Sequence, residues 1–194
     1  MSDTTPSGRP AVFIDRDGTL IDDLHYLSDP ERVRLRPGAV EALTSLRAAG
    51  FLLIVATNQS GVARGLFSLD RMEAVHRRLV EILAADEVRI EGIYACPHHP
   101  SEGSPPYRQD CSCRKPRPGL FLAAKRDHDI DLARSFAIGD RGRDLAPLKG
   151  LGGRGYLINA DAAPPEEDLR FADARGGSLT EAARWILGER DQAK

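Results

Sequence analysis

Residues 11–22 read AVFIDRDGTLID, and this stretch decides the fold and first points to the chemistry. Its start, Ala11 to Ile14, is a mostly apolar run that is typical of a buried strand. Two carboxylates follow, Asp15 and Asp17. Like charges held so close repel each other unless a positive group lies between them. Taken alone, the stretch fits a strand with an Asp-Gly turn, and it also fits a site for a metal ion and a phosphate.

Strand-like and helix-like segments alternate along the rest of the chain. Apolar runs predict strands at residues 51–57, 90–96, 135–140 and 155–158. The spacing of apolar residues predicts helices at 37–50, 68–85, 118–127, 143–149 and 178–188, with Ser68 as an N-cap. Such alternation is typical of a Rossmann-like α/β fold, in which helices flank a parallel sheet. The acidic, proline-containing stretch 160–177 is predicted to be a surface loop.

Length and composition indicate one globular domain. The 194 residues are 41% hydrophobic, which predicts a single domain over 11–190, and the polar residues 1–10 are expected to be a disordered leader. The net charge of −2 provides no basic surface for general binding of nucleic acid or anionic membranes. Neither a signal peptide nor a membrane span is evident, which favours the cytoplasm. Nothing in the sequence requires more than a monomer.

Polar side chains follow three of the predicted strands. They are Asp15 and Asp17 after the first strand, Thr57, Asn58, Gln59 and Ser60 after the second, and Asp140, Arg141 and Asp144 after the fourth. Ligands of open parallel sheets bind at the carboxyl ends of the strands, so these side chains are expected to share one site. Each has an ordinary alternative: Asp140 could cap a helix, and Lys115 could be a solvated surface charge. Their joint occurrence favours a catalytic site, although Asp144 has no evident role.

This set of residues suits the hydrolysis of a phosphate monoester. A carboxylate can attack phosphorus and form an aspartyl phosphate, which divides one difficult displacement into two easier steps. Mg²⁺ would neutralise the paired acids, and a lysine and a threonine hydroxyl would stabilise charge on the phosphoryl oxygens. A second carboxylic acid can protonate the leaving oxygen and later deprotonate the attacking water. Asp15 and Asp17 are therefore expected to lie close together because a metal and a phosphate come between them.

The three cysteines lie together in a proline-rich loop that has almost no aliphatic side chains. Cys96 and His98 form a C-x-H pair, and Cys111 and Cys113 form a C-x-C pair. Three thiolates and one imidazole make a closed tetrahedral Zn²⁺ site, which predicts a structural zinc ion for the loop 96–113. His99 is the alternative to His98 as the imidazole ligand. The loop ends at Arg114 and Lys115, so zinc is expected to position the phosphate-binding cation.

Four motifs resemble those of the haloacid dehalogenase superfamily of phosphatases, in the expected order. They are FIDRDGTLID (13–22), ATNQSG (56–61), RKPRPG (114–119) and AIGDRGRD (137–144). TNQSGVARGLF, IYACPHHP and CSCRKPRPGL are further similar to the heptose bisphosphate 7-phosphatases. Histidinol-phosphate phosphatases share the framework and the cysteine loop but usually carry an acid at the position of Ser60.

The resemblance implies a role for each matching position. Asp15 would be the nucleophile and Asp17 the general acid/base. Mg²⁺ would be held by the Asp15 carboxylate, the Asp17 backbone carbonyl and Asp140, and Thr57 and Lys115 would bind the transferring phosphoryl group. The substrate site would be lined by Asp23, Leu24, His25, Tyr26, Asn58, Gln59, Ser60, Arg114 and Arg141. No insertion is long enough to form a separate cap domain, so the zinc loop and residues 23–26 would take its place.

The expected reaction is removal of the 7-phosphate from a heptose 1,7-bisphosphate by a Mg²⁺-dependent phosphomonoesterase. The alternatives among enzymes are a histidinol-phosphate phosphatase, a broader sugar-phosphate phosphatase and a polynucleotide 3′-phosphatase, the last disfavoured by the neutral charge balance. A phosphoacceptor signalling domain would carry its aspartate after the third strand, where Cys96 stands here. A zinc-based binding module would leave Asp15, Thr57 and Asp140 unexplained. The anomer of the heptose stays open.

Overall fold

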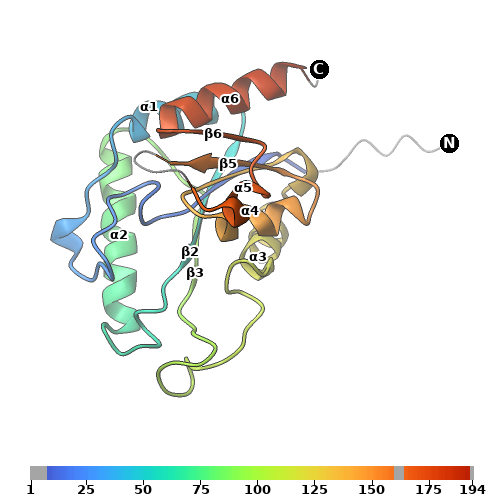
Figure 1. Cartoon of the computed structure of the whole chain (residues 1–194). Helices are drawn as coiled ribbons and strands as arrows, with labels where there is room; N and C mark the ends of the chain where they lie inside the picture. The colour runs from blue at the N-terminus through green and yellow to red at the C-terminus, as the bar shows by residue number, and fades with distance from the viewer. Residues whose placement is uncertain (1–7, 160–163, 193–194) are drawn as a thin grey trace.

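A six-stranded parallel sheet forms the centre of the molecule (Figure 1). The computed structural model describes residues 8–159 and 164–192. The strands are β1 (Ala11–Ile14), β2 (Leu52–Asn58), β3 (Gly92–Cys96), β4 (Phe136–Gly139), β5 (Arg154–Ile158) and β6 (Ala174–Gly176). Their order in the sheet is β3-β2-β1-β4-β5-β6, and all neighbouring strands run parallel. The predicted Rossmann-like architecture is confirmed.

Helices cover both faces of the sheet. One face carries α1 (Ala39–Ala48), α2 (Leu69–Ala85) and α6 (Leu179–Gln192), and the other carries α3 (Gly119–His128), α4 (Gly142–Lys149) and the short α5 (Glu166–Leu169) (Figure 1). Two short 3₁₀ turns, Pro30–Arg32 and Leu132–Arg134, complete the elements. The predicted N-cap of α2 is confirmed, because the side chain of Ser68 accepts a hydrogen bond from the amide of Arg71.

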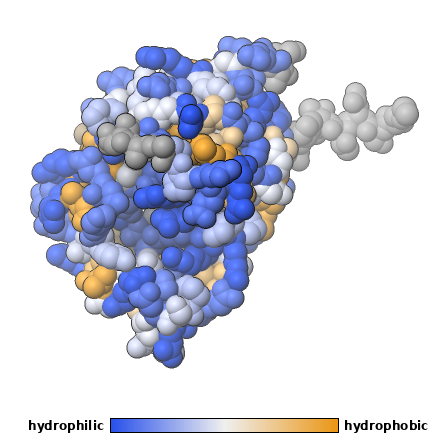
Figure 2. Space-filling view, viewed as in Figure 1, coloured by the Kyte–Doolittle hydropathy of each residue, from blue (hydrophilic) through white to orange (hydrophobic). Residues whose placement is uncertain are grey.

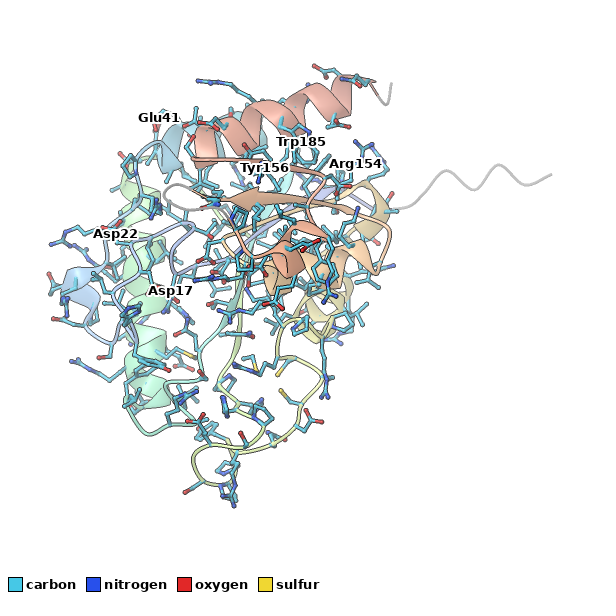
Figure 3. The ribbon with its side chains drawn as sticks, viewed as in Figure 1. Asp17, Asp22, Glu41, Arg154, Tyr156 and Trp185 are labelled. Atoms are coloured by element: carbon cyan, nitrogen blue, oxygen red, sulfur yellow. The ribbon has the colours of Figure 1, made fainter. Side chains whose placement is uncertain are left out.

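The central strands supply both layers of the core. Val12 and Ile14 pack toward α1, α2 and α6, whereas Ala11 and Phe13 pack toward α3 and α4. This division follows from the two-residue period of a strand and explains why the run is apolar throughout. Figure 3 labels Tyr156 on β5 and Trp185 on α6, whose ring centroids lie 5.6 Å apart.

The register of the sheet brings the ends of β1 and β4 to one level. Ile14 lies opposite Val55 of β2 and Ile138 of β4, and the amide of Asp15 donates to the carbonyl oxygen of Ile138. The residues after these strands therefore leave the sheet at the same edge. The loop 97–118 between β3 and α3 extends past this edge (Figure 1), and no separate cap domain is present among the described residues.

Two predictions about irregular segments need correction. The stretch 160–177 contains α5 and the edge strand β6, so it is more than a surface loop; its residues 160–163 lie outside the described residues. The proposed leader 1–10 includes two residues that are bonded to the domain. The amide of Arg9 donates to the carbonyl oxygen of Asp129, and the carbonyl oxygen of Pro10 accepts from the amide of Leu52. Residues 1–7 lie outside the described residues.

The surface toward the viewer in Figure 2 is largely hydrophilic, with separate hydrophobic spots. Within residues 8–159 and 164–192, no helix has the length and apolar character needed to cross a membrane.

Candidate active site

A cleft of about 320 Å³ lies at the carboxyl ends of the strands. Asp15, Arg16 and Asp17 follow β1, and Asp140, Arg141, Arg143 and Asp144 follow β4. Residues 57–61 and Arg64 come from the end of β2 and the segment after it, and Asp23, His25, Tyr26 and Arg114 come from other loops. The structure thus brings together almost all predicted site residues. Leu24 is an exception, because it packs against the core and does not line the cleft. Lys115 lies beneath the cleft.

Lys115 is buried between two carboxylates. Its side chain is 1% exposed, and Nζ lies 2.6 Å from Asp15 Oδ1 and 2.7 Å from Asp144 Oδ1. The ammonium group also donates to the carbonyl oxygen of Ala56 at 2.6 Å. Burial lowers the pKa of Lys115, but Asp144 and Asp15 more than offset this, and the pKa lies above its ordinary value. Lys115 therefore stays charged next to the proposed nucleophile.

Asp144 has a structural role that its position in the sequence does not reveal. One carboxylate oxygen faces Lys115, and Oδ2 accepts from the amide of Arg141 at 3.1 Å, at the N-terminus of α4. The same residue therefore holds the lysine and caps the helix that follows β4. Asp140, immediately before this helix, is left facing the cleft.

The acids of the cleft carry more negative charge than Lys115 can balance. Burial raises the pKa of Asp15 to about 7, against the opposing charge of Lys115, and Asp144 and Asp17 raise it further. Burial and the charge of Asp144 likewise raise the pKa of Asp140 to about 6. Two carboxyl groups that resist ionisation side by side indicate that a further cation belongs in the cleft.

The oxygen atoms of this cluster fit a magnesium ion. Carboxylate oxygens of Asp15, Asp140 and Asp144 lie within 4.8 Å of one another, and oxygens of this kind are the ligands that Mg²⁺ prefers. Gly18 lies next to these carboxylates, and its lack of a side chain leaves room beside them. It adopts φ +78°, and a Cβ there would come 3.0 Å from Asp140 Oδ2. The Asp17 carboxylate is outside this cluster, and a contact of its backbone carbonyl with the metal stays a prediction.

A hydrogen-bonded network holds the Asp17 carboxylate. Arg16 donates through Nε to Asp17 Oδ2 at 3.1 Å and through Nη2 to Oδ1 at 3.0 Å. Gln59 donates from Nε2 to Asp17 Oδ2 at 2.7 Å and to the Thr57 hydroxyl at 2.8 Å. The predicted acid/base and the predicted phosphate-binding hydroxyl are therefore connected through one amide.

Asn58 connects the end of β2 to the loop that carries Lys115. Its Oδ1 accepts from the amide of Lys115, and its Nδ2 donates to the carbonyl oxygen of Lys115, both at 3.0 Å. This pair of bonds places Asn58 as a support for the lysine, while its side chain also borders the cleft. The loop is thus held at its point of entry into the site.

The mouth of the cleft is lined by cations and a strained turn. His25 and Tyr26 adopt φ of +49° and +59°, values that are uncommon for residues other than glycine. The guanidinium of Arg64 lies 5.9 Å from the centre of the Tyr26 ring and forms an ion pair with Glu102 of the cysteine loop. Sequence reasoning did not identify Arg16, Arg64 or Arg143 as residues of the site. The signal for Arg64 was its place in the motif TNQSGVARGLF.

Cys96, His98, Cys111 and Cys113 converge on one point. Their ligand atoms lie within 4.8 Å of one another, and Figure 3 shows sulfur atoms of the loop close together. The separations are 3.5 Å for Cys96 to Cys111, 3.2 Å for Cys111 to Cys113 and 3.3 Å for His98 Nδ1 to Cys113. Ligands about 2.3 Å from a tetrahedral zinc ion stand at roughly such separations. The four residues fit a closed zinc site.

The low pKa of the Cys113 thiol and the place of His99 agree with that interpretation, whereas hydrogen bonding to Cys113 and burial raise the pKa of Cys96. Hydrogen bonding to Cys96, Cys111 and His98 lowers the pKa of Cys113 to about 5, in spite of burial. His99 is turned away from the cysteines. Its Nδ1 accepts from the amide of Glu102 at 3.0 Å, and its Nε2 lies 3.2 Å from Arg64. His98 is thus the histidine that the fold brings to the cluster.

Comparisons with known proteins agree with this architecture. The family model described as polynucleotide kinase 3 phosphatase matches residues 11–174. A protein of Pasteurella multocida (strain Pm70), named D-glycero-beta-D-manno-heptose-1,7-bisphosphate 7-phosphatase, is 41% identical over 160 residues, which are 82% of this chain and 86% of that protein. A protein of the same name from Photorhabdus laumondii is 41% identical over 183 residues, 93% of this chain and 97% of that protein.

A solved structure supports the same assignment. It is the crystal structure of D,D-heptose 1,7-bisphosphate phosphatase from B. bronchiseptica complexed with magnesium and phosphate. Its sequence is 31% identical, and it superposes with a TM-score of 0.76 over 93% of this chain and 99% of that one. The chain therefore belongs to the haloacid dehalogenase superfamily of phosphatases, and within it to the family of the heptose 1,7-bisphosphate 7-phosphatases.

Proposed function

We propose that this protein removes the 7-phosphate from D-glycero-β-D-manno-heptose 1,7-bisphosphate through an aspartyl phosphate on Asp15. The observation that carries the proposal is the meeting of Asp15, Asp17, Thr57 and Lys115 at one edge of the sheet, in a family whose named members have this activity. The names of the relatives specify the β anomer, and this choice was open from the sequence alone.

The residues divide the reaction into two steps. In the first, a carboxylate oxygen of Asp15 attacks phosphorus, the bond between phosphorus and the C7 oxygen breaks, and Asp17 donates its proton to that oxygen. In the second, Asp17 takes a proton from water as the water attacks phosphorus, and the bond to Asp15 breaks to release inorganic phosphate. Lys115 and Thr57 stabilise the charge on the phosphoryl oxygens in both steps.

Asp15, Asp140 and the backbone carbonyl of Asp17 are the groups that would hold magnesium. The ion, when bound, supplies positive charge that neutralises the acids and polarises the phosphoryl oxygens. The crowding of carboxyl groups around Asp15 and Asp140, which raises the pKa of both, supports this assignment. The B. bronchiseptica phosphatase, whose crystal structure is a complex with magnesium and phosphate, supports it as well.

A second phosphate on the substrate suits the cations at the mouth of the cleft. Arg114 and Arg141, with Arg64 and Arg143, border the same hollow as Asp15. Arginine pairs with phosphate through two parallel hydrogen bonds, so a bisphosphate would be held at its far end. Residues 23–26 and the cysteine loop form the remaining walls in place of a cap domain.

The competing substrates are histidinol phosphate, other sugar phosphates and a nucleic acid 3′-phosphate. The family model carries the name of a polynucleotide phosphatase, but the net charge of −2 gives no excess of positive charge for general binding of a nucleic acid. Ser60, where histidinol-phosphate phosphatases usually carry an acid, favours a sugar phosphate over an amino alcohol phosphate. A monomer in the cytoplasm stays a prediction.

The test is a comparison of kcat/KM for release of inorganic phosphate from four substrates. They are the β and α anomers of heptose 1,7-bisphosphate, histidinol phosphate and a 3′-phosphorylated oligonucleotide. We expect the β anomer to be preferred over each other substrate by at least about tenfold, a difference of roughly 1.4 kcal/mol in transition-state binding. Activity should vanish in EDTA and return with Mg²⁺. A preference for histidinol phosphate or the oligonucleotide would overturn the substrate assignment.

Zinc is expected to support activity from the cysteine loop. Cys113 immediately precedes Arg114, whose side chain donates to the carbonyl oxygen of His98 at 3.2 Å. Replacing Cys111 by serine removes a thiolate, so the zinc content should fall well below one ion per chain and kcat/KM should drop by at least about tenfold. The exposed neighbour Ser112 provides the control, and Ser112→Ala should keep both. Elemental analysis and the phosphate assay measure the two effects. Full activity in a zinc-free Cys111→Ser protein would refute the role of the ion.

A further inference from the structure

Arg16 stands between the two catalytic aspartates, Asp15 and Asp17, in the sequence, and its side chain is buried. The whole residue is 1% exposed, which is rare for an arginine unless it is paired. The carboxylate and amide that its side chain contacts belong to Asp17 and Gln59. Its remaining nitrogen, Nη1, has no hydrogen-bond partner among the described residues. The directed contacts of this side chain thus converge on the acid/base and its neighbour.

The guanidinium controls the orientation of two groups at once. Nε and Nη2 lie 3.1 and 2.9 Å from Asp17 Oδ2, and Nη2 also donates to Oδ1 at 3.0 Å, so two nitrogens of one planar group hold both oxygens of the carboxylate. Nη2 also donates to Gln59 Oε1 at 2.9 Å. Because the amide oxygen of Gln59 is held in this way, its Nε2 must face Asp17 Oδ2 and the Thr57 hydroxyl. Arg16 therefore aligns the acid/base with the phosphate-binding hydroxyl.

These contacts distinguish the two oxygens of Asp17. Oδ2 accepts from Arg16 Nε and Gln59 Nε2 and lies 2.9 Å from Arg16 Nη2, whereas Oδ1 has Arg16 Nη2 as its one partner among the described residues. A carboxylate offers about two lone pairs on each oxygen, so Oδ2 has both in use and Oδ1 has one left. The side chain of Asp17 is 25% exposed and lines the cleft, so a ligand in the cleft can reach this carboxylate.

We infer that Arg16 is a positioning residue that selects Asp17 Oδ1 as the oxygen of proton transfer. The inference rests on the proposed function, in which Asp17 protonates the leaving oxygen. Arg16 exchanges no proton itself: the proton passes from Asp17 Oδ1 to the C7 oxygen as the bond from that oxygen to phosphorus breaks. In the second step a proton of the attacking water returns to Oδ1. Without the guanidinium the carboxyl group would rotate away from the leaving oxygen.

The experiment compares two leaving groups in Arg16→Lys. An alkoxide such as the C7 oxygen needs the proton from Asp17, whereas the phenolate of 4-nitrophenyl phosphate leaves without one. Lysine keeps the positive charge but lacks the planar guanidinium that binds both oxygens of the carboxylate. We expect kcat/KM for heptose 1,7-bisphosphate to fall about 100-fold or more, and that for 4-nitrophenyl phosphate to fall less than about tenfold. Because kcat/KM includes only steps up to formation of the phosphoenzyme, the hydrolytic step does not contribute. Single-turnover rates with excess enzyme extend the range for the slow substrate.

Three further variants separate positioning from folding. Asp17→Asn should show the same discrimination between leaving groups, and Arg16→Lys combined with it should add little further loss. Leu43→Ala, a buried change on α1, destabilises the fold and should leave the ratio of the two kcat/KM values unchanged. The ratio is independent of how much enzyme is folded.

Each outcome is decisive for Arg16. An equal loss for both substrates would overturn the inference, since it would mean that Arg16 serves the fold or binds phosphate directly. A wild-type protein that cleaves no heptose 1,7-bisphosphate would instead refute the proposed function. The comparison for Arg16 would then be made with whichever alkyl phosphate the enzyme does cleave.

Discussion

Asp15→Asn is expected to abolish phosphate release while leaving the fold intact. The amide has the shape of the carboxyl group but no nucleophilic oxygen, so kcat should fall by roughly 10⁴-fold or more, as for nucleophiles of other covalent enzymes. Lys115 keeps two of its three contacts, to Asp144 and to the carbonyl oxygen of Ala56. The measurement is phosphate release together with mass spectrometry of acid-quenched enzyme.

The quenched wild-type enzyme should carry one added phosphoryl group on the peptide that contains Asp15. The same peptide of Asp15→Asn should carry none, and Asp17→Asn provides the control, because it can still be phosphorylated by an aryl phosphate. A phosphoryl group on another residue would refute covalent catalysis by Asp15. A kcat of Asp15→Asn within tenfold of the wild-type value would refute it as well.

The same variant should change the dependence of stability on pH. Burial raises the pKa of Asp15 from 3.8 to about 7. A carboxyl group whose pKa is higher in the folded state holds its proton better when folded, so the wild type loses stability as the pH rises between these values. Asparagine does not titrate. The free energy of unfolding of the variant, minus that of wild type, should therefore increase from pH 3.8 to about pH 7. Above about pH 7 this difference should stay constant. Denaturant unfolding without added magnesium measures this, and a difference that shrinks with rising pH would contradict it.

The sequence predicted which side chains would lie together where they follow directly from strand ends. Asp15, Thr57 and Asp140 each follow or end a short apolar run, and parallel pairing must bring such ends to one edge. The cysteine loop could be predicted for a different reason: with almost no aliphatic side chains it needs a ligand to hold it. The pattern of ligand types was therefore more informative than any secondary-structure signal.

The parts that the sequence could not predict depend on tertiary contacts. The strand β6 has only three residues and pairs at the edge with β5, so it has no run long enough to show a period. Arg16 lies between two acids, a pattern typical of exposed turns, and its burial follows only when Gln59 and Asp17 fold around it. Leu24 packs against the core, and only the fold shows which side chains of the segment before the bend at 25–26 leave the cleft.

Lys115→Met is expected to damage both stability and catalysis. It leaves Asp15 and Asp144 buried without the ammonium group that contacts each of them within 2.7 Å. Removing one partner of a buried ion pair costs about 3–5 kcal/mol, which for a chain of this size lowers Tm by roughly 6–20 °C. Loss of a positive charge from the phosphoryl site should lower kcat by at least about 100-fold.

Lys149→Met is the matched control for the ion pair. Lys149 Nζ also lies 2.6 Å from a carboxylate, that of Asp173, but this lysine side chain is 32% exposed. A partly solvated pair contributes only about 0–1 kcal/mol, so Tm and kcat should hardly change. Equal effects of the two substitutions would show that burial of Lys115 has no special importance.

A second substitution separates the two effects of Lys115. Removing the Asp144 carboxylate in Lys115→Met/Asp144→Leu takes away a buried charge that has lost its ion-pair partner. The hydrogen bond from the Arg141 amide is lost as well, so stability should recover only in part, by about 1–4 kcal/mol. Catalysis should not recover, because the phosphoryl group still lacks its cation. Thermal unfolding and kcat of the four proteins in the double-mutant cycle give both answers. If kcat recovered together with Tm, Lys115 would act only by holding the fold, and its place in the phosphoryl site would have to be abandoned.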